Sequence, residues 1–223
     1  MFFDSRRSSI LATNGMVATS QPLAATTGLR VLMEGGNAVD AAIAAAAALN
    51  VVEPMSTGVG GDMFALVWDN KEKSVRALNG SGRAPAAANI EELTKKGLSA
   101  MPDTGVYSVA TPGTVHGWET LLDSCGTMPL SKLLCPAIDY AENGFPVSDI
   151  ISFQWQQCLG KLSAFPSGTE MLPNGGTPSQ GDFVKLPTLA VTLRAIAEGG
   201  SEAFYNGRSE ERRVGKECRS RWS

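Results

Sequence analysis

GGNAVDAAIAAAAALNVVEPMSTGVGGDMFALVW, at residues 35–68, is the stretch that decides the fold of this chain. In its first half, Asn37 can cap a helix, and residues 41–49 are all alanine except for one isoleucine and one leucine. A helix that is apolar on every side is normally buried on every side, and alanine lets neighbouring layers approach it closely. Pro54 ends the helix. The sequence therefore predicts a central, buried helix.

The second half of the stretch predicts a loop and a strand. Residues 55–62 form a glycine-rich loop, and the continuous apolar run at 63–68 has the length of a strand. A polar turn at 69–73 and a second strand at 74–79 would complete an antiparallel hairpin.

A further helix precedes this stretch, at residues 22–34, with Ser20 as its expected N-cap and a glycine pair after its end. Four-residue spacing gives it one nearly smooth face, which another backbone can approach closely; this face consists of Ala24, Gly28 and Leu32. The order helix, helix, strand, strand favours a layered α/β fold with helices packed on an antiparallel sheet.

Beyond residue 80 the pattern predicts more helices than strands. Gly144 and the pair at 199–200 are expected to end two of the helices. The expected elements are a short helix at 89–96, a strand at 106–110, and helices at 115–124, 129–143 and 188–198. The sequence has no internal repeat and no obvious linker between domains.

Composition excludes several classes of protein. The 223 residues are 43% apolar and 18% charged, which is ordinary for a globular protein, and no apolar run is long enough to span a membrane. The first residues do not resemble a secretory signal, which favours a cytoplasmic location. The cysteines lack zinc or redox spacing, so we expect free, mostly buried thiols and no metal or cofactor; they are Cys125, Cys135, Cys158 and Cys218.

The end of the chain differs from the rest. Residues 208–223 read RSEERRVGKECRSRWS, have no periodicity, and resemble the translation of a sequencing adapter, so we expect a non-native tail. Without the tail the net charge changes from −3 to −6, because six basic and three acidic residues are left out. The remaining chain has no basic stripe, and nucleic-acid binding is not predicted.

Several motifs together resemble one family. The GGNAVDAA, VVEP and STGVGGDMF elements lie within residues 15–85, and TPGTVHGW, GTMPL, AENGFPV and EAFYNG follow between 111 and 207. In this combination, residues 1–207 resemble the N-terminal part of the large subunit of a γ-glutamyltranspeptidase proenzyme. They are most similar to the branch of glutathione-hydrolase-like proteins and oxamate amidohydrolases.

The resemblance implies a fold and a mechanism. The fold would be the αββα sandwich of N-terminal-nucleophile hydrolases, incomplete here because the family's small subunit completes the sheets. The nucleophile would be the first threonine of that subunit, activated by its own α-amine, and the oxyanion hole would lie there too. The family cleaves γ-glutamyl amides. We therefore expect no catalytic residue in this chain, no activity of the chain alone, and the small subunit as its partner.

The resemblance also implies a substrate-binding arginine, and here the sequence departs from the family. Ser81 occupies the place where the family has an arginine for the substrate carboxylate, and Arg83 follows two residues later in NGSGRAP. We expect Arg83, and less strongly Ser81, to bind substrate. Two alternatives stay open: a related amidohydrolase of the oxamate or cephalosporin-acylase type, and a truncated product without catalysis.

Other candidate sites have simpler explanations. The GVGG loop at 58–61 leads into a strand and lacks the spacing of a phosphate loop, so close backbone approach is the favoured role of its glycines. His116, the only histidine, has no nucleophile motif around it. Glu53 and Asp62 flank the loop and could resemble a carboxylate pair, but capping and hydrogen-bonding roles are favoured for them.

Overall fold

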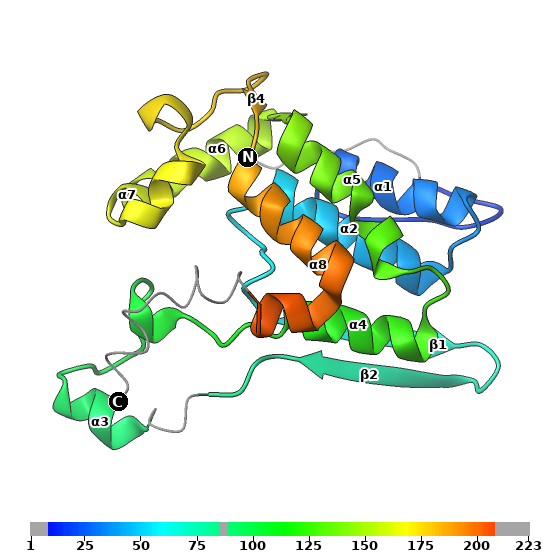
Figure 1. Ribbon diagram of the computed structural model, residues 1–223, viewed down its shortest axis with the longest axis horizontal. Helices are drawn as coiled ribbons and strands as arrows, with labels where there is room; N and C mark the ends of the chain where they lie inside the picture. Colours follow the sequence, from blue (N-terminus) through cyan, green and yellow to red (C-terminus); the bar gives the residue numbers. More distant parts are fainter. Residues whose placement is uncertain (1–8, 85–88, 208–223) are drawn as a thin grey trace.

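The computed structural model describes residues 9–84 and 89–207, and it has a group of packed helices lying beside a long hairpin (Figure 1). The helices in these ranges are α1 (Pro22–Met33), α2 (Ala38–Val52), α3 (Ile90–Lys95), α4 (Thr114–Cys125), α5 (Leu130–Asn143), α6 (Asp149–Gln157), α7 (Leu159–Ser163) and α8 (Pro187–Tyr205). The strands pair antiparallel as β1 (Met63–Asp69) with β2 (Ser74–Gly80), and β3 (Phe145–Pro146) with β4 (Phe183–Val184).

Helix α2 is the centre of the helical group, where it packs against α1 and α5. The predicted cap is confirmed: the Asn37 side chain accepts from the Val39 and Asp40 amides, and the Asp40 side chain accepts from the Asn37 amide. Of its 15 residues, 11 are buried. Ala42 is exposed and lies in a groove lined by residues 14–19. The prediction that α2 is buried on every side is therefore wrong at Ala42.

The smooth face predicted on α1 is confirmed at Gly28. A side chain added there would place its Cβ 3.0 Å from the carbonyl oxygen of Ala41 on α2 and 3.0 Å from a methyl group of Val17. Contacts this short are tighter than most real Cβ contacts, so a methyl group would require Ala41 and Val17 to move slightly. Glycine therefore lets α1 and α2 pack with their backbones close together.

The β1–β2 hairpin has one covered face and one open face. Met63, Ala65 and Val67 point toward the core and pack below α4, whereas the alternate residues of both strands lie on the other face. The large apolar side chains of that face are 57% to 78% exposed; they are Phe64, Leu66, Trp68 and Val75. An apolar sheet face of this kind is normally packed against another layer.

Some predicted elements differ from the observed ones. Gln21, and not Ser20, caps α1 through its side chain, because the Ser20 hydroxyl instead donates to Glu53 at 2.5 Å. The strand predicted at 106–110 is wrong: Val106–Ser108 is a single 3₁₀ turn. Helix α8 has a break at the predicted glycine pair, because Gly200 is non-helical with a φ of 62°, but the helical segment that follows it up to Tyr205 was not predicted. Helices α6 and α7 were not predicted.

The cysteines also differ from the prediction. Cys125, Cys135 and Cys158 are free, but Cys135 is exposed and the other two are only partly buried. Cys218 and the predicted non-native tail at 208–223 lie outside the described residues. Within the described ranges, no helix combines the length and the apolar character needed to cross a bilayer.

Candidate substrate-binding loop

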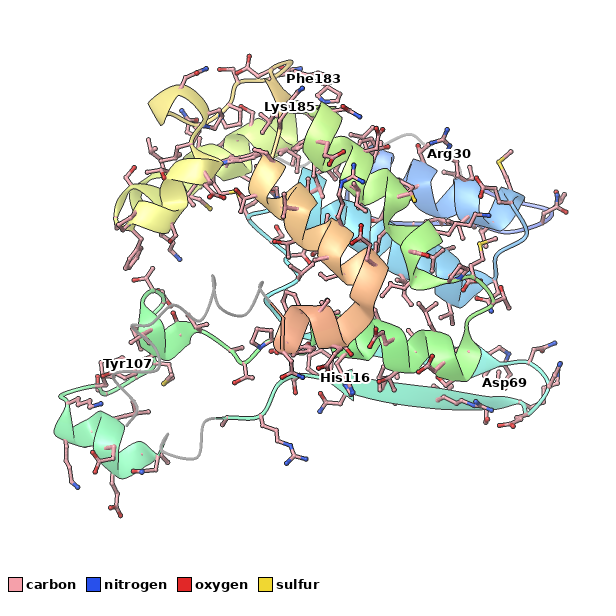
Figure 2. The ribbon with its side chains drawn as sticks, in the orientation of Figure 1. Arg30, Asp69, Tyr107, His116, Phe183 and Lys185 are labelled. Atoms are coloured by element: carbon pink, nitrogen blue, oxygen red, sulfur yellow. The ribbon has the colours of Figure 1, made fainter. Side chains whose placement is uncertain are left out.

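Ser81 and Arg83, the two predicted substrate-binding residues, lie directly after β2, and both are exposed. Their loop meets two other segments. We call the meeting point the loop junction and define it as residues 61–62, 79–82 and 111–114. Figure 2 helps to place it: Asp69 marks the turn of the hairpin, and His116, in the first turn of α4, marks the opposite end, where the junction lies.

One carbonyl group joins the glycine-rich loop to α4. The Gly61 oxygen accepts from the amides of Gly113 (2.9 Å) and Thr114 (3.1 Å) and from the Thr114 hydroxyl (2.8 Å). The first amide groups of a helix have no partner within the helix, and no side chain caps α4. The glycine-rich loop therefore supplies the missing cap, which fixes the loop relative to the helix.

Two glycines let the backbones at the junction touch. A Cβ added to Gly82 would lie 1.8 Å from the carbonyl oxygen of Thr111, and one added to Gly113 would lie 2.1 Å from the carbonyl oxygen of Gly80. Neither position can accept even a methyl group without a shift of the backbone. Close backbone approach was predicted instead for the glycines at 58–61. It is wrong at Gly58 and Gly61, because a Cβ on Gly58 would meet nothing within 4 Å and one on Gly61 would meet only the Gly58 oxygen at an ordinary 3.4 Å.

Hydrogen bonds fix the orientation of Ser81. The Oδ1 atom of Asn79 accepts from the Ser81 amide at 3.0 Å and meets the Ser81 hydroxyl at 2.8 Å. Because an amide N–H can only donate, the atom facing it must be the side-chain oxygen of Asn79. The hydroxyl facing the same oxygen must then donate as well. Its proton is committed, and Ser81 Oγ is left as an acceptor toward any ligand.

Asp62 holds the next residue of the loop. Its Oδ1 atom accepts from the Gly82 amide at 3.3 Å. Two consecutive amides, those of Ser81 and Gly82, are thus bound by the side chains of Asn79 and Asp62. The hydrogen-bonding role favoured for Asp62 is confirmed by this contact, whereas the contribution of Asn79 was not predicted. The signal for it was an asparagine two residues before a serine, which is typical of a side chain that binds its own backbone two residues on.

Two of the described arginines form ion pairs, whereas Arg30 and Arg83 form none. Arg76 pairs with Asp69 and Glu72, and Arg194 pairs with Glu142. In both cases a hydrogen bond donated to the neighbouring glutamate, together with the charge of that glutamate, raises the pKa of the arginine above its usual value. Among residues 9–84 and 89–207, no carboxylate forms an ion pair with Arg83. Within these ranges, no acidic side chain competes with an anion for its guanidinium.

The remaining candidates have structural roles. Glu53 is buried at the end of α2, where its side chain accepts from Ser20, and Asp62 is bound to the loop, so the two do not form a carboxylate pair that shares a proton. His116 is exposed, and its amide donates to the Tyr205 hydroxyl at 3.3 Å. No cluster of metal ligands occurs in the part of the chain that the structure describes.

Asp40 anchors a second loop, and this role was not predicted. The buried carboxylate accepts from the amides of Asn37, Thr127 and Met128 and from the Thr127 hydroxyl. Burial alone would raise the pKa of Asp40, but these hydrogen bonds outweigh it and hold the pKa below its ordinary value. Asp40 therefore fixes the loop between α4 and α5 to the first turn of α2.

Comparison with known proteins identifies the family. The family model for gamma-glutamyltranspeptidase matches residues 24–212. This chain belongs to that family. Three curated relatives are similar over 92% of the chain: the glutathione hydrolase proenzyme of Bacillus subtilis (38% identical), the glutathione hydrolase-like YwrD proenzyme of the same species (39%), and the oxamate amidohydrolase proenzyme of Klebsiella pneumoniae (37%). The chain spans 36% to 40% of the length of these relatives.

Solved structures agree with the predicted fold class. The gamma-glutamyltranspeptidase of Helicobacter pylori matches with a TM-score of 0.88 and 31% identity, over 96% of this chain and 62% of that one. The cephalosporin acylase of Bacillus halodurans matches with a TM-score of 0.86 and 43% identity, over 93% of this chain and 40% of that one. The layered α/β fold of this family is confirmed, and the described residues form a helix-rich part of it with few strands.

Proposed function

We propose that this chain is the substrate-binding part of a self-processing amidohydrolase or acyltransferase that cleaves a γ-glutamyl or closely related acid amide. The observation that carries the proposal is Arg83. It is an exposed guanidinium without an ion pair among the described residues, and it follows a loop whose backbone is fixed on three sides. A planar guanidinium can bind a carboxylate through two parallel hydrogen bonds.

The chemistry of the loop assigns different tasks to Arg83 and Ser81. A carboxylate needs hydrogen-bond donors, and the only proton of the Ser81 hydroxyl is already donated to Asn79. On this proposal Arg83 binds the carboxylate, and Ser81 Oγ accepts a hydrogen bond from an N–H group of the substrate. The family's arginine has then moved two positions along the chain, and the vacated position provides an acceptor.

We place the nucleophile outside this chain. The resemblance implies that it is the N-terminal threonine of the small subunit, whose α-amine takes the hydroxyl proton. On this proposal, residues 1–223 alone bind substrate weakly and cleave nothing. The curated relatives are named as proenzymes and are more than twice as long as this chain, which supports a partner that comes from the same precursor.

The open face of the hairpin supports the same partner. Phe64, Leu66 and Trp68 lie side by side on β1 and are 69%, 78% and 57% exposed. We propose that a sheet of the small subunit covers these side chains, because burying a large apolar side chain stabilises a protein by about 1.5–3 kcal/mol. Without that cover the hairpin would leave two unpaired edges and an apolar face, which promote aggregation.

The test uses the complete proenzyme and a panel of acid amides, with glutathione and oxamate compared side by side. Arg83→Ala should lower kcat/KM for the accepted acid about tenfold to a hundredfold. Arg83→Lys should do nearly as much harm, since an ammonium cannot reproduce the two-point contact. Arg76→Ala is the matched control, because Arg76 is on the same hairpin but is already paired. Self-cleavage at a normal rate, with kcat/KM unchanged for every acid in Arg83→Ala, would refute the role of Arg83.

A second candidate function is supported by two relatives. The Klebsiella pneumoniae relative is named an oxamate amidohydrolase, and the Bacillus halodurans structure, at 43% identity, is a cephalosporin acylase. An enzyme of either type would keep the mechanism and change only the acid that Arg83 binds. Adding a β-lactam with an acidic side chain to the panel distinguishes these cases. If no amide is cleaved by the correctly processed protein, the alternative of a product without catalysis gains support instead.

A further inference from the structure

We propose that Asn79 and Asp62 are positioning residues that hold the Gly80–Arg83 loop in the shape that binds substrate. The proposal rests on the substrate-binding role given above to Arg83. It assigns no contact with substrate to Asn79 or Asp62. Their task is to bind two consecutive amides of the loop, so that Arg83 leaves the junction in one direction.

The two amides that follow β2 have side-chain acceptors in place of partners on a neighbouring strand. In an antiparallel pair, the amides beyond the last residue of a strand lose their partners on the neighbouring strand. The register of β1 and β2 ends with Met63 opposite Gly80, so the Ser81 and Gly82 amides lie just past it. Asn79 and Asp62 accept from these two amides at 3.0 Å and 3.3 Å. Asp62 itself lies just before Met63, so the two acceptors come from both strands of the hairpin.

The loop also has little space on the side of residues 111–113. Gly82 has no room for a Cβ against the Thr111 carbonyl, and Gly113 has none against the Gly80 carbonyl. These contacts exclude movement toward residues 111–113 but do not prevent movement away from them. The hydrogen bonds that the Ser81 and Gly82 amides donate to the Asn79 and Asp62 side chains resist that movement. Packing and hydrogen bonds therefore restrict the loop together.

Fixing the loop should affect substrate binding more than the chemical step. A carboxylate clamp that is already in place when the substrate arrives does not lose conformational entropy on binding. If the two acceptors are removed, Arg83 keeps its charge and its chain position but samples more orientations. The expected effect is a higher KM for the acid amide, with a smaller change in kcat. Self-cleavage of the precursor does not use this loop and should proceed at its usual rate.

The experiment compares three substitutions with one matched control in the complete proenzyme. Asn79→Ala should raise KM roughly tenfold, and Asp62→Ala roughly threefold, since a single hydrogen bond is worth about 0.5–1.5 kcal/mol. Asp62→Asn keeps an acceptor oxygen and should stay within about twofold of the native protein. Asp69→Ala is the control: Asp69 accepts from the amides of Lys71 and Glu72 at the other end of the same hairpin, so it weakens the hairpin without touching the loop.

A double substitution separates positioning from a general loss of stability. If Asn79 acts through Arg83, Arg83→Ala combined with Asn79→Ala should have the same kcat/KM as Arg83→Ala alone. Losses that add, or a KM unchanged in Asn79→Ala, would overturn the proposal, as would an Asp69→Ala enzyme with the same rise in KM. If Arg83→Ala itself leaves kcat/KM unchanged, the role of Arg83 fails first, and that result is distinct from the failure of Asn79 alone.

Discussion

The two ends of the β1–β2 hairpin are built in different ways. At the turn, Asp69 accepts from two backbone amides, Arg76 is paired with two acids, and Lys73 adopts a left-handed conformation with a φ of 52°. At the open end, glycines bring three backbone segments into contact, and Arg83 has no acidic partner in the described residues. The charges of the turn are therefore paired within the hairpin, whereas the cation at the open end has no acidic partner among the described residues.

The largest expected effect tests the glycine contact at the open end. Gly82→Ala forces the loop away from Thr111, because the new Cβ would lie 1.8 Å from its carbonyl oxygen. A shift of about 1 Å in a substrate-positioning group can lower the rate about a hundredfold, so we expect a loss of that order in kcat/KM. Steady-state kinetics of the complete proenzyme measure it.

Gly160→Ala is the control for this substitution. Gly160 lies in α7, and a Cβ added there would meet nothing within 4 Å. It should leave kcat/KM unchanged. Equal losses in both variants would show that the open end is no more constrained than an exposed helix.

The next largest effect is expected at Asp40, a buried carboxylate that binds backbone amides, in comparison with Asp69, which binds amides at the exposed turn. Replacing the buried Asp40 by Asn leaves donors without a partner and should lower the free energy of unfolding by about 1–3 kcal/mol near neutral pH. Asp69→Asn should have a smaller effect. Urea denaturation of the complete proenzyme at several pH values measures both, and a larger effect for Asp69→Asn would contradict the comparison.

The pH dependence of the Asp40 effect has a definite sign. Hydrogen bonds hold the folded-state pKa of Asp40 below its ordinary value of 3.8. The stabilisation is therefore complete above pH 3.8 and is lost as the pH falls through the lower, folded-state pKa. The difference between the native protein and Asp40→Asn should shrink over that acidic range. A difference that grows on acidification would contradict the assignment.

The smallest effect is expected at the turn and has the opposite sign. Lys73→Gly removes a side chain from a left-handed conformation that glycine adopts more easily. We expect the free energy of unfolding to rise by about 0.5 kcal/mol, because the relief of strain slightly exceeds the added freedom of the unfolded chain. Thermal denaturation measures the change. A clear loss of stability would show that the bond from Lys73 to the Asn70 side chain is worth more than the strain.

Local sequence patterns predicted much of this structure. The alanine run gave α2, the cap at Asn37 was correct, and the polar turn placed both strands of the hairpin. The predictions failed where a distant residue decides the outcome. Ser20 is an ordinary capping residue, but Glu53, 33 positions away, takes its hydroxyl. The helix end expected at the glycine pair is confirmed by the non-helical Gly200, but the helical segment after it was not predicted, and at its start the distant Glu119 accepts from the Ser201 amide.

The assignment of the non-native tail, the cytoplasmic location and the substrate roles of Arg83 and Ser81 stay predictions. The first concerns residues outside the described ranges. The cytoplasmic location can be tested only in a cell, and the substrate roles only with a substrate. For Arg83 the structure adds a guanidinium without an acidic partner among the described residues and a constrained backbone, which makes the substitution experiments decisive.

The sequence alone determined the family, the layered fold class and the position of the two candidate residues, because these depend on motifs and on periodicity within short windows. Only the tertiary structure decided which groups are still free to act. Asp62 is bound to the Gly82 amide, 20 residues further along the chain, and Arg83 is left unpaired among the described residues. The physical reason is that a hydrogen bond or an ion pair depends on distances in space, and segments separated by 20 or more residues meet only when the chain has folded.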